Sequence, residues 1–212
     1  MTDDTPKNLE AGAESPRDRM LNSATELFQR NGVAATALSD IVERSGAPRG
    51  SLYHYFPEGK SQLTAEATAR AGRQLGAMIS LLTATRTPVE TIRLMVGHFR
   101  QQLIDSDYTA GCPVAPGALE AGVDGPDVRR TAGEAFTAWE ATVSAALWQR
   151  GLAAGEANAL ATLVISAIEG ALVLGKAQQS TRALDRVEQA LITHVESLLP
   201  SAAPDATRAT DA

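Results

Sequence analysis

The sequence predicts an all-α protein of about nine helices, and three observations favour this fold. Apolar residues make up 44% of the 212 residues but aromatic residues only 4%, and such an Ala- and Leu-rich chain favours helices over sheets. Apolar residues recur at helical spacing along the longer segments. No stretch shows a convincing strand pattern. We expect a small N-terminal three-helix domain followed by a larger C-terminal helical domain.

Both ends of the chain are polar and offer little to bury, which predicts a disordered arm over residues 1–14 and a disordered tail over 200–212. Between them we expect one domain over 15–62 and a second over 63–199. The formal net charge of −6 excludes a strongly basic, nonspecific nucleic-acid coat, although a local contact face for nucleic acid stays possible.

The first helix has clear start and stop signals. Ser15 is placed to be the N-cap and Pro16 the first helical residue. Asn31-Gly32 is expected to end it. The apolar positions between these ends follow helical spacing; they are Leu21, Ala24, Leu27 and Phe28.

The next two helices are short. Thr36 is expected to cap the second, which turns Leu38, Ile41 and Val42 inward. A tight turn over 45–47 follows, and Pro48 begins the third helix, because its missing N–H is harmless at that position. The third helix ends before Pro57.

Six further helices follow by the same reasoning. They are expected over 60–84, from Pro88, within 111–122 as a short segment interrupted by proline, from Pro126, over about 156–179 and over about 183–199.

Two short helices joined by a glycine-containing turn form the arrangement that places the second helix in the major groove of DNA. At 100° per residue, Leu52 and Phe56 share the face that packs inward, while Gly50, Ser51 and His54 point away. Arg49 is placed to bond a guanine edge or a phosphate, and Lys60 stands at a helix N-terminus, which favours a phosphate. The residues that we expect to contact DNA are Thr36, Arg49, Gly50, Ser51, Tyr53, His54, Tyr55 and Lys60.

Purely structural roles remain an alternative for some of these residues. Tyr53 and Tyr55 could cover the edge of the small domain, and Lys60 could be an ordinary surface lysine. Residues 15–60 hold six cations and five anions, a net charge of about +1. DNA binding at this face would therefore depend on the placement of single cations rather than on bulk charge.

Residues 17–63 resemble the DNA-binding domain of the TetR family of transcriptional regulators. The resemblance rests on ATELF at 24–28, Gly32, Thr36, Asp40-Ile41, Gly46, GSLY at 50–53, YFP at 55–57 and Lys60. GAPRGSLYHYFPEGK, GCPVAPGALE and SAIEGALVLGKAQQS look like the LmrA/YxaF-type subgroup and extend the resemblance over nearly the whole chain. Two features depart from the family pattern. Pro48 replaces a common Ser or Thr, and Glu58-Gly59 lengthens the linker and adds a negative charge near the expected phosphate.

The resemblance implies a ligand-responsive transcriptional regulator without a cofactor. It would be a repressor that leaves a palindromic operator in double-stranded DNA when a small apolar or aromatic ligand binds to the C-terminal domain. One alternative is a small-molecule-binding protein with a non-functional helix-turn-helix. A second is an all-α enzyme that uses Glu169 and His98 as an acid and base pair.

The helix over about 156–179 is apolar on all sides, so it is expected to be buried on all sides, with one face on the core and another on a second subunit. The segment over 183–199 adds a near-heptad apolar seam. Both features predict a homodimer through these two helices. Glu169, midway along the first, argues against a membrane span.

Small-molecule pockets in helical proteins lie between helices and are mostly apolar. The predicted ligand-lining residues are Met78, Phe99, Phe136, Trp139, Ile168 and Glu169, and ordinary core packing is the alternative for each. We expect Glu169 either to face the pocket or to pair with Arg130 or Arg150.

Other chemistry has little support in the sequence. His54, His98 and His194 are too far apart in sequence for metal-ligand spacing, and no phosphate loop or nucleophile elbow appears, so we expect no metal site and no catalysis. The single cysteine, Cys112, allows no intramolecular disulfide. It could be a thiol sensor, but no neighbouring cation is evident to lower its pKa. Without a secretory signal or an uninterrupted apolar span, the protein is expected to be cytoplasmic.

Overall fold

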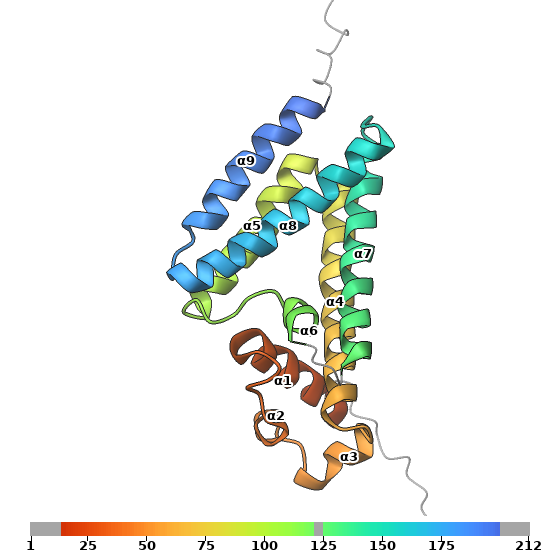
Figure 1. The fold of residues 1–212 in the computed structure, drawn as a ribbon, viewed down its shortest axis with the longest axis vertical. Coiled ribbons are helices and arrows are strands. Elements are labelled where there is room, and N and C mark those ends of the chain that lie inside the picture. The colour runs from red at the N-terminus through yellow and green to blue at the C-terminus, as the bar shows by residue number, and fades with distance from the viewer. Residues whose placement is uncertain (1–13, 121–124, 200–212) are drawn as a thin grey trace, which may run out of the picture.

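The computed structural model describes residues 14–120 and 125–199, apart from the side chain of Arg49. Every regular element in these ranges is helical, so the predicted all-α class is confirmed (Figure 1). The predicted arm, apart from Glu14, and the predicted tail lie outside the described residues. The elements are α1 Pro16–Asn31, α2 Leu38–Ser45, the 3-10 turn η1 Arg49–Ser51, α3 Leu52–Tyr55, α4 Lys60–Thr85, α5 Pro88–Asp105, α6 Ala115–Leu119, α7 Pro126–Trp148, α8 Ala154–Gln178 and α9 Arg182–Leu198.

Helix α1 begins and ends as its sequence predicts. The Ser15 hydroxyl accepts a hydrogen bond from the Asp18 N–H at 3.1 Å, and Pro16 is the first helical residue. At the other end Gly32 has φ 82° and donates its N–H to the Phe28 carbonyl at 2.9 Å. A positive φ favours glycine, which explains why the helix stops here.

The predicted cap of α2 is wrong by one residue. The N-cap is Ala37, and the carboxylate of Asp40 accepts its N–H at 3.3 Å. Thr36 is 1% exposed, and its hydroxyl donates to the Gly32 carbonyl at 2.7 Å. The threonine therefore closes the loop after α1 instead of capping α2, because a hydroxyl can satisfy either kind of backbone group.

The third predicted helix is shorter and less regular than expected. The chain makes the 3-10 turn η1 over 49–51 before the four-residue helix α3, and the α3 backbone ends at Phe56 with φ −132°. Leu52 and Phe56 are buried as predicted.

Two hydrophobic cores share the helix α4. The N-terminal core joins α1, α2 and α3 to the first turns of α4, and it includes Phe28, Ile41, Phe56, Leu63 and Ala67. Further along, α4 enters the larger core of α5 to α9 through Leu75 and Ile79. Figure 1 shows α4 running from the small N-terminal group of helices to the far end of the molecule beside α7. The predicted boundary at 62/63 thus falls within one continuous helix.

Helices α4 and α7 approach each other closely. The Trp139 indole N–H donates to the Gly72 carbonyl at 3.0 Å. A Cβ atom on Gly72 would lie 2.7 Å from the Cβ of Ala135, so only glycine fits at this crossing. Helices α5, α8 and α9 cross beside this pair (Figure 1).

Helix α8 has the length and apolar composition that a membrane span requires, and it is the only such helix in the described residues. It nevertheless packs against α7 and α9 and contributes eight residues to the C-terminal hydrophobic core. This packing is that of the central helix of a helical domain.

Candidate functional site

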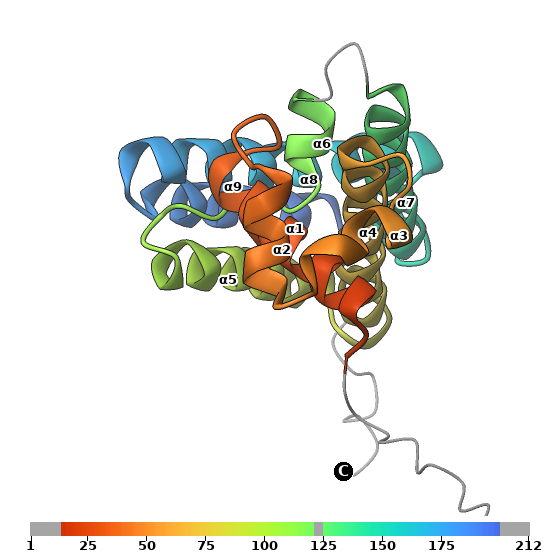
Figure 2. The same cartoon turned by 90° about the horizontal axis from the view of Figure 1, so that it is seen from below.

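The surface around α2 and α3 carries most of the residues predicted to contact DNA (Figure 2). Gly46 ends α2 with φ 62°, in the left-handed region that favours glycine, and the chain then turns through Pro48 into η1. Figure 2 views the molecule from below, with α1, α2 and α3 nearest the viewer. This end of the molecule lies opposite the end where α4 stops.

Several predicted residues face outward on this surface. Tyr53 is 66% exposed and His54 is exposed, while Gly50 has no atom within 4 Å of the position where a side chain would begin. A close approach of another molecule to η1 is therefore unobstructed. Tyr55 is half-buried against the N-terminal core, with its ring 5.0 Å from that of His54 in an edge-on arrangement.

Two predicted hydroxyl contacts are occupied within the chain. The Ser51 hydroxyl donates to the Pro48 carbonyl at 2.7 Å. The Thr36 hydroxyl is buried against Gly32, so its side chain does not reach the surface.

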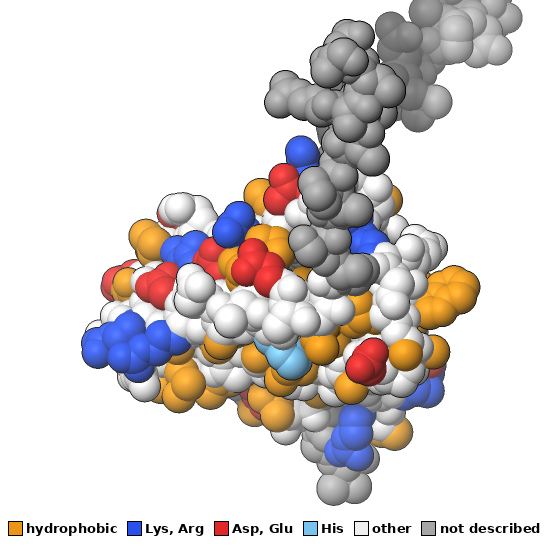
Figure 3. Space-filling model, turned by 90° about the horizontal axis from the view of Figure 1, so that it is seen from above, with side chains coloured by type: hydrophobic (Ala, Val, Ile, Leu, Met, Phe, Trp, Pro, Cys, Tyr) orange, Lys and Arg blue, Asp and Glu red, His pale blue; other side chains and the backbone are white. Residues whose placement is uncertain are grey.

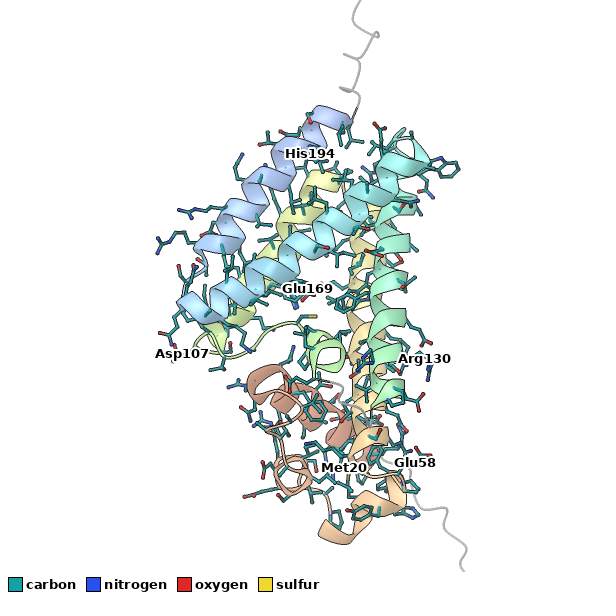
Figure 4. All side chains as sticks on the ribbon, in the orientation of Figure 1. Met20, Glu58, Asp107, Arg130, Glu169 and His194 are labelled. Carbon is teal, nitrogen blue, oxygen red and sulfur yellow. The ribbon has the colours of Figure 1, made fainter. Side chains whose placement is uncertain are left out.

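The two cations that sequence reasoning singled out differ in how well they are placed. Lys60 is the first residue of α4, as predicted, and its Nζ atom lies 3.5 Å from the Ala34 carbonyl. The backbone of Arg49 begins η1, whereas its side chain lies outside the described part of the chain. Glu58 is exposed at the turn between α3 and α4 (Figure 4), and its N–H donates to the Gln62 side chain at 3.1 Å.

Two other cations of the N-terminal helices are engaged in ion pairs. Arg17 pairs with Glu66 and also lies over the Phe56 ring, with 5.3 Å between Cζ and the ring centre. Arg44 pairs with Glu26. These two cations are therefore already compensated, whereas Lys60 has no carboxylate within 4.0 Å among the described residues.

Sequence reasoning named no residue of α2 for this surface. A hollow between α2 and α3 is nevertheless lined by Leu38, Ser39, Val42, Glu43, Leu52 and Tyr53. Ser39 and Glu43 lie opposite the buried Ile41 on the helix, so the same wheel argument that was applied to α3 would have found them.

Glu169 does not pair with either of the arginines considered from the sequence. Arg130 bonds to Asp127 at 3.2 Å and Glu134 at 2.7 Å, and Arg150 donates to the Arg86 carbonyl at 2.6 Å. Figure 4 shows Glu169 in the interior and Arg130 on the outer side of α7. The predicted arginine pairing is therefore wrong.

The side chain that acts on the pKa of Glu169 is instead the thiol of Cys112. Burial raises the pKa of Glu169, and a hydrogen bond with Cys112 partly offsets that effect. Burial, followed by the nearby Glu169, raises the pKa of Cys112 well above its ordinary value. The thiol therefore stays protonated at neutral pH, which argues against the thiol-sensor hypothesis.

The six predicted ligand-lining residues do not surround one cavity. Phe99, Trp139 and Ile168 are buried in the C-terminal core, with Met78 and Phe136 packed against it. Met78 and Phe99 line a hollow beside α1, whereas Trp139 lines a groove between α4 and α7. The acid and base pair considered from the sequence has no support either. Partial burial lowers the pKa of His98, but no contact between His98 and Glu169 occurs among the described residues.

Polar contacts fasten α1 to the C-terminal helices. The ammonium group of Lys176, on α8, donates to the Gln29 carbonyl at 2.9 Å, in the last turn of α1. The side chains of Gln29 and Gln102 both donate to the Gly111 carbonyl, at 3.1 and 2.7 Å. After α6, the Glu120 carboxylate accepts the Ala34 N–H at 3.0 Å. The N-terminal helices are thus held by α8 and by the α5–α6 connection as well as by α4.

Comparison with known proteins matches both parts of the chain. Residues 20–67 match the profile of the bacterial regulatory proteins of the tetR family, and residues 88–190 match the profile described as "Transcriptional regulator LmrA/YxaF-like, C-terminal domain". An uncharacterized HTH-type transcriptional regulator of Mycobacterium tuberculosis is 36% identical over 193 residues, covering 88% of this chain and 97% of the relative.

Two further similarities agree with this match. The uncharacterized HTH-type transcriptional regulator YxaF of Bacillus subtilis is 38% identical over 159 residues, 74% of this chain and 83% of the relative. The crystal structure of a TetR transcriptional regulator from Chloroflexus aurantiacus has a TM-score of 0.72 at 27% identity and covers 88% of this chain and 97% of that chain. These relatives are named as regulators and not as enzymes.

Glu169→Gln should stabilise the protein increasingly as the pH rises above the ordinary carboxyl pKa. Because the folded-state pKa of Glu169 is raised, the folded protein holds this proton where the unfolded chain has lost it, and wild-type stability falls over that window. Glutamine carries no charge and escapes this loss. Urea unfolding from pH 4 to 8 would measure the difference.

The exposed Glu196 on α9 supplies the matched control, Glu196→Gln, for the loss of one negative charge. A stability difference between Glu169→Gln and wild type that shrinks with rising pH would contradict the assignment.

Proposed function

We propose a ligand-released repressor, because this chain belongs to the TetR family of bacterial regulatory proteins and carries a C-terminal domain of the LmrA/YxaF-like type. The protein is a DNA-binding transcriptional regulator. Regulators of this family bind DNA and dimerise. We further propose the direction of its response, its contact residues, its dimer interface and a cytoplasmic location.

The proposed DNA surface is the outward side of η1 and α3 with the start of α4. Tyr53 and His54 are exposed there, and Gly50 leaves the backbone open to a close approach. Arg49 would read a guanine edge or clamp a phosphate, and Lys60 with the N-terminus of α4 would hold a phosphate. Tyr55 and Ser51 would add contacts at the margin, and Thr36 would support the loop after α1.

The observation that carries the proposed release is the sharing of α4 between the two cores. Leu63 belongs to the core behind the DNA surface, whereas Leu75 and Ile79 belong to the core of the C-terminal helices. A ligand that prefers one placement of α4 would shift the population of DNA-binding forms. A coupling of about 1–3 kcal/mol, or about 5–150-fold in affinity, is typical of such systems.

The proposed ligand is a small apolar or aromatic molecule that binds among the C-terminal helices. Met78 and Phe99 in the hollow beside α1 are the best placed of the six candidates, because that hollow touches both α4 and α1. A ligand there would act only indirectly on the other four candidates, by shifting the core behind the hollow. They are Phe136, Trp139, Ile168 and Glu169.

The proposed dimer interface is centred on α8. Leu163, Val173 and Leu174 are 45%, 61% and 49% exposed in the single chain, and Gly170 between them is open. The apolar seam of α9 packs within the chain instead, since Leu184, Leu191 and Val195 are buried. Helix α9 would therefore contribute its polar outer side to the margin of the interface. A two-fold axis along α8 would present two recognition surfaces to a palindrome, with half-sites about 34–36 Å apart.

Ligand release can be tested on DNA from upstream of the protein's own gene. Fluorescence anisotropy should detect one preferred segment, and an uncharged aromatic compound selected by thermal shift should weaken its binding by about 5–150-fold. Tight binding that is unchanged by every stabilising compound would contradict ligand release. If the protein prefers no segment, with or without compound, only the alternative of a small-molecule-binding protein remains.

Substitutions of Lys60 and Arg49 should distinguish a contact with phosphate from a contact with a base. Lys60→Ala should weaken all DNA about equally and flatten the slope of log affinity against log salt by about one unit, because one phosphate contact is lost. Arg49→Ala should weaken the preferred segment by about 1–3 kcal/mol more than random DNA. Arg93→Ala, an exposed cation on α5, is the matched control. Equal losses on both DNAs for Arg49→Ala would make Arg49 a phosphate contact.

Leu163→Glu should convert the dimer into monomers. A carboxylate buried without a partner costs several kcal/mol, so the dimer dissociation constant should rise by at least about 100-fold. Leu81→Glu is the control, since Leu81 on α4 is even more exposed, at 64%, but lies outside the α8 face. Sedimentation velocity would measure both, and an intact dimer in Leu163→Glu would contradict the interface.

A further inference from the structure

Lys176, near the end of α8, joins the C-terminal helices to the last turn of α1. Gln29 is among the last four residues of α1, so its carbonyl has no partner within that helix. The Lys176 ammonium group donates to this carbonyl at 2.9 Å. A cation is favoured there, because the C-terminal end of a helix carries a partial negative charge. The contact therefore combines a directed hydrogen bond with an electrostatic attraction.

The stem of Lys176 is fixed as well as its ammonium group. A Cβ atom on Gly111 would lie 3.3 Å from the Cδ of Lys176, so the stem passes directly over the α5–α6 connection. The Gly111 carbonyl accepts hydrogen bonds from the side chains of Gln29 and Gln102. The ends of α1 and α5 thus meet α8 around a single glycine. Lys176 is half-buried there, which limits the orientations open to its side chain.

Glu120 binds the loop that follows α1. Its carboxylate accepts the Ala34 N–H at 3.0 Å, and it lies so close to Gly32 that a Cβ atom there would collide with it. Glu120 also acts electrostatically on Lys176. The cation therefore meets a carbonyl at the end of α1, and the anion meets an N–H just beyond it. Each charge faces a backbone group of the opposite polarity.

Helix α8 also carries the uncovered apolar face of the proposed dimer. Figure 3 views the molecule from the end opposite the proposed DNA surface, and hydrophobic side chains are visible along its outer edge. The exposed apolar residues of α8 include Val173 and Leu174. Both lie within one helical turn of Lys176. One short stretch of α8 thus faces the second subunit and also bonds to the N-terminal helices.

A second attachment matters because α4 alone fixes the N-terminal helices incompletely. A group of helices joined to the rest of the molecule by one helix can still tilt about it. The bonds from Gly111 and Glu120 come from the α5–α6 connection and the end of α6. Lys176 differs from them because it belongs to the helix of the proposed dimer interface.

We infer that Lys176 is a positioning residue that sets the separation of the two recognition surfaces in the dimer. This inference rests on the proposed dimer through α8. Packing of the two α8 helices would fix Lys176 of each subunit relative to the two-fold axis, and its bond to the Gln29 carbonyl would then fix α1. Because α1 packs against α2 and α4 in the N-terminal core, η1 and α3 would follow it. Binding to two half-sites requires such a defined separation.

Distances between two spin labels in the dimer, measured without DNA by double electron–electron resonance, test this inference. Ser39→Cys supplies an exposed labelling position on α2, while the native Cys112 is buried. Wild type should give a narrow distance distribution, and Lys176→Met should broaden it, because the N-terminal helices regain freedom to tilt. Methionine keeps an unbranched stem without the charge. Lys176→Arg keeps a charged donor and should preserve the narrow distribution.

Binding to DNA with altered half-site spacing supplies a second readout. Fluorescence anisotropy would compare the preferred segment with a version lengthened by a single base pair between its half-sites. Lys176→Met should bind the preferred segment about tenfold more weakly, because a charge-assisted hydrogen bond that holds the correct separation is lost. It should bind the lengthened segment no more weakly than wild type does. Arg93→Met, at an exposed cation of α5, is the matched control and should change neither readout.

Three results would overturn the inference: an unchanged distance distribution in Lys176→Met, equal broadening in Arg93→Met, or equal losses of Lys176→Met on both DNA segments. If Lys176→Met does not fold, Gly111→Ala decides, because its added Cβ displaces the Lys176 stem and leaves the charge in place. A wild type that is monomeric in sedimentation velocity would contradict the proposed dimer together with this inference. A dimer with unchanged label distances would overturn the inference alone.

Discussion

The continuity of α4 through two hydrophobic cores is the constraint on which the rest of the structure depends. Leu63 packs in the N-terminal core, behind the proposed DNA surface, and Ile79 packs in the C-terminal core, both fully buried on one helix. Gly72 allows α7 to lie against the middle of α4, with the Trp139 indole bonded to its carbonyl. Any tilt of α4 must therefore disturb both cores, because close-packed interiors tolerate only discrete rearrangements.

A second connection limits how α4 can move. Lys176 on α8 bonds the last turn of α1, and Glu120 after α6 bonds the loop that follows it. Burial lowers the pKa of Lys176, while Glu120 opposes that effect. These polar contacts are specific in geometry, so they hold the N-terminal helices in one orientation to the C-terminal helices. The proposed ligand hollow beside α1 lies close to them, since Gln29 and Gln102 line it as well.

The outward and inward sides of the recognition region were predictable because they follow from helical geometry alone. Leu52 and Phe56 are buried and Tyr53 and His54 are exposed, as the wheel predicts. Thr36 was misplaced, since a hydroxyl before a helix can cap it or bond backwards, and local sequence does not distinguish the two. The apolar seam of α9 looked like a subunit interface but is used within the chain, because apolar spacing shows that a face is buried and not what covers it.

The family, the helical class and most helix ends follow from local sequence, since Ser15 with Pro16 and Gly32 act through hydrogen bonds and dihedral angles within a few residues. Which distant groups meet, in contrast, depends on the packing of the whole fold. The proximity of Glu169 to Cys112 and the hydrogen bond from Arg150 to the Arg86 carbonyl depend on how long helices cross. Such crossings are set by the summed packing of many side chains, so no local pattern along the chain records them.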